Sequence, residues 1–145
     1  MASTEYEILT AVHTTISAIS FTVSPEEIAI RKWPYDSSYS KDHWYPGITI
    51  HRSVEREFAG TNERDDIGYG VQITMVLDNS ADPTETDIFS DWRQKIRKAF
   101  IHQRLSGVTS VCTCLVEPGP VYKNVPEDYD VSTLLIRVIS RETRS

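Results

Sequence analysis

Four histidines are the side chains of this sequence best suited to acid–base chemistry or metal binding, because imidazole titrates near neutral pH. His13 is predicted at the border of a helical stripe, His51 in a strand, His43 in a loop and His102 near a helix end. None stands in His-x-x-x-His or His-Glu-x-x-His spacing, which places two ligands on one helical face. Each histidine is therefore interpreted as a surface or packing residue.

The densest group of carboxylates lies in residues 62–66, NERDD. Carboxylate oxygens bind divalent cations, but the Asp-x-Asp-x-Asp-Gly order of a calcium loop is absent. Interspersed charges of both signs are typical of a solvated loop. The sequence also contains no glycine-rich nucleotide loop, no Gly-x-Ser-x-Gly and no Cys-x-x-Cys. We therefore expect no enzymatic activity, no metal and no cofactor.

The two cysteines, Cys112 and Cys114, are separated by one residue in a predicted strand. Alternate residues of a strand point to the same face, which is a poor geometry for a mutual disulfide. A metal site would need more ligands than the neighbouring sequence supplies. The pair is interpreted as two small buried strand residues.

A chain of 145 residues is long enough for one core but short for two, so residues 1–145 are predicted to form a single domain. The net charge is −6, and residues 1–79 hold 12 acidic against 6 basic side chains. An acidic total argues against tight general binding to nucleic acid, which depends on lysine and arginine at phosphates.

No apolar run approaches the roughly 20 residues needed to span a bilayer. The N-terminal residues MASTEYE have neither the basic lead nor the apolar core of a signal peptide. We expect a protein that is made in the cytoplasm and has no membrane partner.

Two helices are predicted from apolar residues at spacings of three and four. The first covers residues 4–20. The second covers residues 82–105, with Asp82 and Pro83 as start signals, a basic last turn and Gly107 as a left-handed cap. Its apolar stripe, which includes Trp92, requires a sheet to cover.

Alternation of apolar and polar residues predicts the strands of that sheet. The predicted strands are residues 28–32, 47–53, 69–77, 108–117 and 131–140. The fold class is therefore predicted as α+β, a mostly antiparallel sheet with two main helices packed on it. Both faces of the last strand are apolar, which indicates a second covering layer such as a partner subunit. The C-terminal residues RETRS are expected to fray.

Two exposed loops are predicted, at about residues 35–46 and 55–68. The first contains a possible partner-binding patch of Tyr39, His43, Trp44 and Tyr45, since rigid aromatic side chains bury much area at small entropy cost. The alternative is that Trp44 and Tyr45 fold back over the edge of the core. The second loop is charged and is predicted to be a long hairpin loop or arm.

Arginines on the second helix provide a candidate subunit interface. Arg93, Arg97 and Arg104 are predicted to form one line beside the apolar stripe, and arginine forks suit carboxylates. An identical neighbour can present the acidic side chains Glu55, Glu57, Glu63, Asp65 and Asp66. Head-to-tail pairing of this kind closes a ring. The alternative is a solvated helix face on which Asp91 pairs with Lys95.

The order of elements resembles the tail terminator proteins of long-tailed bacteriophages over nearly the whole chain. The matching pieces are residues 46–50, PGITI, the strand at 69–77, the helix residues 92–96, WRQKI, and the later Gly107-Val108. The resemblance implies a compact α/β subunit that forms a six-membered ring on the end of the tail tube. The family has no catalytic signature, so no functional residue is carried over.

The resemblance further implies a mechanical function. The ring caps the tail tube, ends its polymerisation and joins the tail to the head connector, so the partners are further copies, the tube protein and a connector protein. The protein then belongs to the virion tail or neck, after assembly in the host cytoplasm. An acidic channel would let DNA pass without specific binding.

Three alternatives remain open at this point. The chain is another head–tail neck, connector or minor structural protein, or a small cytoplasmic enzyme built around His51, or a monomeric binding module that uses the aromatic patch at 39–45. Alanine at His51 would abolish the activity of such an enzyme, and the module would stay monomeric at every concentration.

Overall fold

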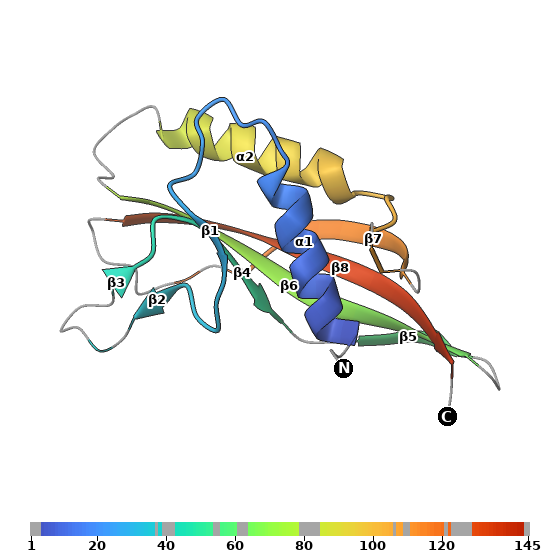
Figure 1. Ribbon diagram of the computed structural model, residues 1–145. Helices are drawn as coiled ribbons and strands as arrows, with labels where there is room; N and C mark the ends of the chain where they lie inside the picture. Colours follow the sequence, from blue (N-terminus) through green and yellow to red (C-terminus); the bar gives the residue numbers. More distant parts are fainter. Residues whose placement is uncertain are drawn as a thin grey trace.

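Two helices lie on one face of a six-stranded sheet, and a separate two-stranded sheet lies at one end of the molecule (Figure 1). The computed structural model describes residues 4–36, 38, 43–53, 56–60, 64–78, 85–105, 107–108, 111–120, 122 and 129–143. The main sheet is mostly antiparallel, so the predicted α+β fold class with two helices packed on the sheet is confirmed.

The main sheet has the strand order β1-β4-β6-β8-β7. β5 also pairs with β6, along the same edge of β6 that pairs with β4. Its strands are β1 (Ile28–Ile30), β4 (Gly47–Arg52), β5 (Arg56–Gly60), β6 (Arg64–Asp78), β7 (Val111–Pro118) and β8 (Tyr129–Thr143). β1 runs parallel to β4, and the other pairings are antiparallel. The two central strands, β6 and β8, pair over 15 residues each.

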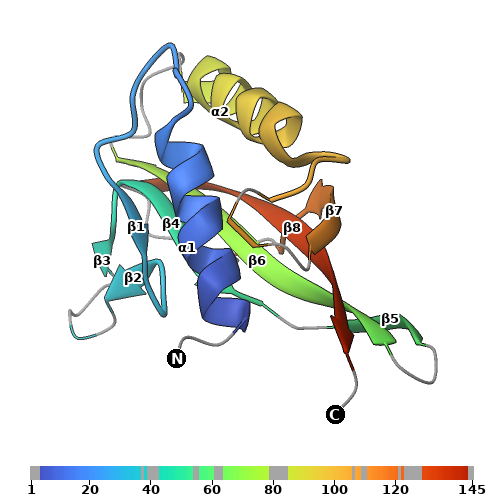
Figure 2. The ribbon, with the colours of Figure 1, turned by 45° about the vertical axis from the view of Figure 1, so that its right-hand side comes forward.

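The core lies between the helices and one face of the sheet (Figure 2). Helix α1 (Thr4–Ser17) packs over β1 and β4, and α2 (Glu85–Phe100) packs over β7 and β8. The helices contribute the predicted stripes, and alternate residues of the strands face them. Fully or almost fully buried members of the core are Ile8, Val12, Ile16, Ile48, Ile50, Val71, Ile73, Trp92, Ile96, Phe100, Leu134 and Ile136.

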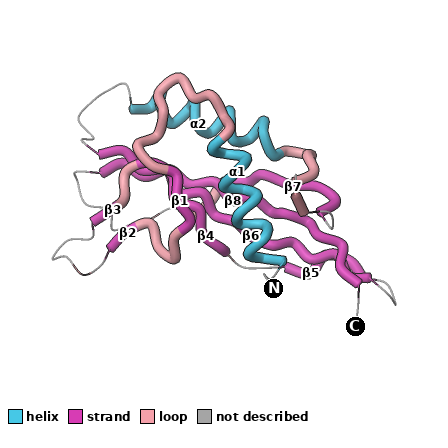
Figure 3. The backbone as a smooth tube through the Cα atoms, viewed as in Figure 1, coloured by secondary structure: helices cyan, strands magenta, loops and turns pink. Residues whose placement is uncertain are grey.

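The loop of residues 18–27 runs from α1 alongside α2 before it enters β1 (Figure 3). The hydroxyl of Thr22 donates to Asp91 Oδ1 at 3.2 Å, and Lys95 Nζ donates to the carbonyl of Ser20 at 2.9 Å. Trp92 Nε1 donates to the carbonyl of Val23 at 2.7 Å. These bonds fasten the loop to α2, so the two helices are joined by more than their apolar contact.

The second helix ends earlier than predicted. It stops at Phe100 instead of Leu105, because His102 takes a left-handed conformation with φ of 56° and its amide donates to the carbonyl of Cys114 at 2.9 Å. Histidine is one of the residues that adopts this conformation more readily than most. Gly107 does have a positive φ of 90°, but it lies beyond the helix end. The predicted start signals at 82–83 lie outside the described residues.

The two central strands are longer than predicted. The described residues of the predicted hairpin loop or arm at 55–68 do form a hairpin, but they are paired strands, β5 and the first residues of β6, and not an open loop. The C-terminal residues 141–143, expected to fray, continue β8 and pair with Arg64–Asp66 of β6. Hydrogen bonding along the ladder extends both strands through polar sequence. β1 ends at Ile30, two residues before the predicted end, and β7 begins at Val111, three residues after the predicted start.

The predicted loop at 35–46 contains a small hairpin of β2 (Tyr35–Asp36) and β3 (His43–Trp44). Trp44 is 2% exposed, and its ring lies 4.8 Å from that of Tyr35 and 5.1 Å from that of Tyr122. The alternative interpretation, in which Trp44 folds back over the core edge, is therefore confirmed. Burial removes Trp44 from the predicted partner-binding patch.

Cys114 is fully buried in β7, and burial raises the pKa of its thiol to about 11. Because the thiolate is the reactive form, we expect Cys114 in a Cys112→Ser variant to resist Ellman's reagent at about pH 8 while folded. It should react fully in concentrated guanidinium chloride. Labelling of the folded variant at the rate of a free cysteine would contradict this burial.

The position of Cys112 differs from the expectation of simple alternation. The pairing of β7 with β8 shifts between Val111 and Thr113, so the alternation is interrupted at Cys112. Val111 and Cys114, three residues apart, are both buried. The prediction that both cysteines share one face therefore loses its geometric basis, and the side chain of Cys112 lies outside the described part.

Candidate functional site

The histidines, which have the most obvious chemical potential, are spread over separate parts of the fold. His13 Nε2 donates to the carbonyl of Ile28 at 2.9 Å, which ties α1 to β1. His43 is exposed, and its Nδ1 lies 3.2 Å from the hydroxyl of Tyr129. Within the described ranges, no three His, Cys, Asp or Glu side chains are close enough to hold a metal ion.

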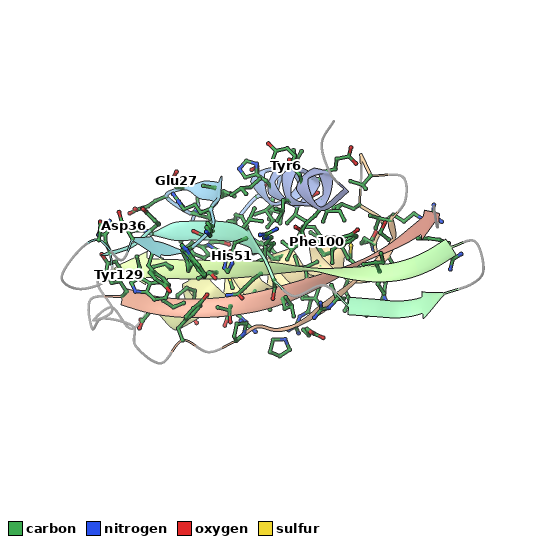
Figure 4. All side chains as sticks on the ribbon, turned by 90° about the horizontal axis from the view of Figure 1, so that it is seen from below. Tyr6, Glu27, Asp36, His51, Phe100 and Tyr129 are labelled. Atoms are coloured by element: carbon green, nitrogen blue, oxygen red, sulfur yellow. The ribbon has the colours of Figure 1, made fainter. Side chains whose placement is uncertain are left out.

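A row of buried polar side chains lies on the sheet face opposite the helices, and Figure 4 views the molecule from that side, with His51 near the middle. His51 Nε2 lies 3.1 Å from Thr74 Oγ1, and Gln72 Nε2 donates to Thr74 Oγ1 at 3.2 Å. Gln72 Nε2 also donates to the hydroxyl of Tyr122 at 2.8 Å. Among the described side chains, these hydrogen bonds join the members of the row to one another and to Tyr122.

The pH dependence of stability should report on His51. Burial lowers the pKa of His51 from its usual value of 6.5, and a hydrogen bond to the backbone of Arg52 opposes this shift. The unfolded chain therefore binds a proton near pH 6.5 that the folded protein resists. Stability from this group is fully present above that pH. It is lost as the pH falls through the unfolded-state pKa towards the lower folded-state pKa.

The test is urea unfolding between about pH 8 and about pH 5, where one proton changes stability by at most about 1.4 kcal/mol per pH unit. We expect the free energy of unfolding to fall towards acidic pH. A His51→Gln variant keeps a side chain that can bond to Thr74 and should show a shallower slope. Equal slopes in the two proteins would exclude His51 as the cause.

A groove of about 690 Å³ lies at the edge of the sheet, where β1 ends at Ile30 while β4 continues to Arg52. We call it the edge groove. Its apolar lining comes from α1, β1 and the segment after β1, and its polar lining comes from α1, the segment after β1 and β4. The residues are Tyr6, Leu9, Ile30 and Trp33, with Glu5, Arg31, Lys32, His51 and Arg52.

The edge groove gathers exposed apolar side chains. Tyr6 is 58% exposed, Ile30 39% and Trp33 56%, and the part of the chain that the structure describes has one further large exposed hydrophobic residue, Val23. Single exposed apolar residues are ordinary, whereas clusters mark sites of protein or ligand binding. The groove is therefore the best candidate for a docking site.

The charges of the groove are mainly positive. Its lining has three cations and one carboxylate, in a protein whose net charge is −6. Arg52 is 73% exposed and pairs with Glu5 at 3.1 Å, and Lys32 Nζ lies 6.0 Å from the ring of Trp33. Arg31 is held by Glu27 at 2.9 Å. The groove thus differs in sign from the protein as a whole.

The arginines predicted as one stripe have three different environments. Arg93 donates to Ser132 Oγ at 2.9 Å and to the carbonyl of Thr133 at 2.7 Å, and burial, followed by the charge of Arg97, lowers its pKa. Arg97 is exposed on α2, and Arg104 lies beyond the helix. The prediction of one continuous helical stripe is therefore wrong, because Arg93 bonds to its own β8 and the helix ends at Phe100.

The alternative interpretation of the same helix face fits better. Asp91 and Lys95 form the expected pair one turn apart, with an oxygen–nitrogen distance of 3.0 Å. Pairs of this kind stabilise a helix slightly and need no partner subunit.

No family model matches the chain, and no curated protein sequence is significantly similar to it. None of the helices that the structure describes is long and apolar enough to cross a lipid bilayer.

The other predicted site residues fall into two groups. Tyr39, Glu55 and Glu63 lie outside the described residues. Glu57 lies on β5, and Asp65 and Asp66 lie on β6, at the projecting end of the sheet. Tyr45 is half-buried, with the guanidinium of Arg31 4.2 Å from its ring centroid, so the predicted aromatic patch does not form one exposed surface.

Sequence reasoning missed the edge groove. Two signals were present: Tyr6 is a large aromatic residue outside the apolar stripe of its helix, and Trp33 directly follows the predicted strand at 28–32 and precedes a proline. Neither signal shows that the two residues meet, because the groove joins three chain segments.

Proposed function

We propose that this protein is a structural subunit of the bacteriophage tail-terminator type. It forms a ring that caps the tail tube, ends tube polymerisation and joins the tail to the head connector. The observation that carries the proposal is the arm, which is the hairpin of β5 and the first residues of β6 and projects beyond both helices (Figures 1 and 2). A projecting hairpin on a compact body suits head-to-tail assembly.

Two further observations support a mechanical role. The polar groups gathered behind the sheet bond to one another, as in the row of His51, Gln72 and Thr74. The edge groove instead offers exposed aromatic and aliphatic side chains, which suit contact with protein. Binding rather than chemistry is the property that these features share.

The location and the remaining partners follow from the same proposal. Subunits assemble in the host cytoplasm and remain in the virion, at the junction of tail and neck. The tube protein lies on one side of the ring and the connector on the other. DNA passes through the channel without specific binding, and the net charge of −6 supports this because a basic channel would hold phosphates.

The test is the mass of the purified chain over a concentration range by light scattering, together with negative-stain imaging of tail tubes. We expect a ring near six subunits, or added density at tube ends only. Tubes already closed by their own terminator are the control and should gain no density. A strict monomer that ignores open tubes would contradict the proposal.

A monomeric binding module is the second candidate, and the edge groove is the observation that favours it. Such a module would keep the mass of one chain at every concentration and would use the exposed Trp33 to hold its ligand. The same mass measurement therefore separates the two candidates.

A further inference from the structure

The arm is the part of the main sheet that neither helix covers (Figures 1 and 2). β5 pairs with β6 there, and the pairing shifts between Glu57 and Ala59, at the position of Phe58. Thin strand ribbons without a packed face are only marginally stable in water. Within the part of the subunit that the structure describes, no helix therefore covers the arm.

The edge groove has the opposite deficiency, because Tyr6, Ile30 and Trp33 are exposed around an unfilled volume of about 690 Å³. The sheet also ends beside it, since β1 is the outermost strand on that side and has only three residues. Apolar side chains next to a strand edge are suited to bind a projecting hairpin, which offers both backbone and side-chain contacts.

Charge identifies the occupant. The groove lining carries three cations against one carboxylate. The described residues of the arm carry three carboxylates against two arginines, and the end of β8 that pairs with the arm adds one side chain of each sign, Arg141 and Glu142. Opposite signs steer association and suppress wrong partners. The complementary surfaces belong to one chain, so a second copy can supply the partner.

We propose that the edge groove of each subunit holds the arm of an adjacent copy. This inference rests on the proposed ring-forming function and names its subunit contact. The groove and the arm of one subunit are close in the chain, because β4 ends in the groove at Arg52 and β5 begins the arm at Arg56. The arm nevertheless projects away from the body, so it points to a neighbouring copy and not into its own groove (Figure 2). Each subunit gives one arm and receives one, which is a heterologous contact that closes into a ring.

The experiment reverses charge on each side separately in the full-length chain. The groove variant is Lys32→Glu with Arg52→Glu, and the arm variant is Glu57→Lys with Asp65→Lys. Each variant alone should raise the concentration for half-assembly by at least about tenfold, because like charges then meet across the contact. Circular dichroism and urea unfolding establish that both variants are folded.

An equimolar mixture of the two variants is the decisive sample. Every contact in an alternating ring then joins either two unchanged surfaces or two reversed surfaces, so the mixture should recover the wild-type mass. Arg97→Glu with Lys98→Glu, on the exposed side of α2, makes the same charge change as the groove variant and should assemble normally.

Two results would overturn the inference while leaving the proposed function standing. One is a groove variant that assembles like the wild type, and the other is a mixture that stays as dissociated as its components. A wild-type chain that is monomeric at every concentration also overturns this contact. The terminator function is then judged separately, by density at the ends of open tubes.

Discussion

Replacing Trp92 with alanine is expected to lower the free energy of unfolding by about 3–5 kcal/mol. Trp92 is 1% exposed, and its ring centroid lies 6.2 Å from that of Phe21 and 6.0 Å from that of Phe89. Its indole nitrogen donates to the carbonyl of Val23 at 2.7 Å. The substitution removes a large side chain from the core and also releases the loop of residues 18–27 from α2.

Urea unfolding followed by circular dichroism measures this loss without relying on tryptophan fluorescence. Trp92→Phe keeps most of the apolar volume and loses the hydrogen bond, so it should cost about 1–2 kcal/mol. Trp33→Ala is the matched control, because this exposed tryptophan should change stability by only about 0.5 kcal/mol or less. Equal losses for Trp92→Ala and Trp33→Ala would contradict the role given to Trp92.

The second large effect is expected at Gly47, where β4 begins. Gly47 has a φ of 109°, and an added Cβ would overlap the carbonyl oxygen of Glu27 and lie 2.7 Å from its nitrogen. The same carbonyl accepts the amide of Ile48 at 2.7 Å, so it cannot move aside without breaking the link to β1. Gly47→Ala should therefore cost about 3 kcal/mol and displace β1 from the sheet.

Gly107→Ala is the control for the cost of backbone strain alone. Gly107 also has a positive φ, of 90°, but an added Cβ there meets nothing within 4 Å. Its substitution should cost about 1 kcal/mol. Chemical denaturation compares the two variants, and amide hydrogen exchange at Ile28–Ile30 reports the loss of β1. Similar costs at both glycines would show that the contact with Glu27 is relieved easily.

The sequence predicted best the elements that carry a complete local pattern. The stripe of Ile8, Val12 and Ile16 defines α1, and the alternation through Val71 and Ile73 defines the middle of β6. These side chains need only one covered face, and the period of each element places them on it. The two-layer α+β arrangement follows because neither stripe is stable in water.

The local sequence pattern could not predict features that depend on pairing between distant segments of the chain. The ends of β6 and β8 are polar, and only the bonds between them keep residues 141–143 in a strand. The end of α2 depends on the bond from His102 to Cys114, which lies on another element. The hydrogen bonds of Arg93 to β8 likewise depend on how α2 is rotated against that strand.

The candidate site was less predictable than the fold for the same reason. The edge groove requires β1 to run parallel beside β4 and α1 to pass over both strands. The residues that line the groove do not predict either arrangement. The acidic segment 55–66 was recognised as an arm from its sequence, but its strand pairing was not.

The long ladder between β6 and β8 has a consequence for synthesis on the ribosome. Its paired residues lie far apart in the chain, from Asp78 with Tyr129 to Arg64 with Thr143. A growing chain therefore completes β6 long before its central neighbour exists, and closure of such a long loop is a slow step. A chain cut before residue 129 would expose the 15-residue edge of β6, a template for aggregation.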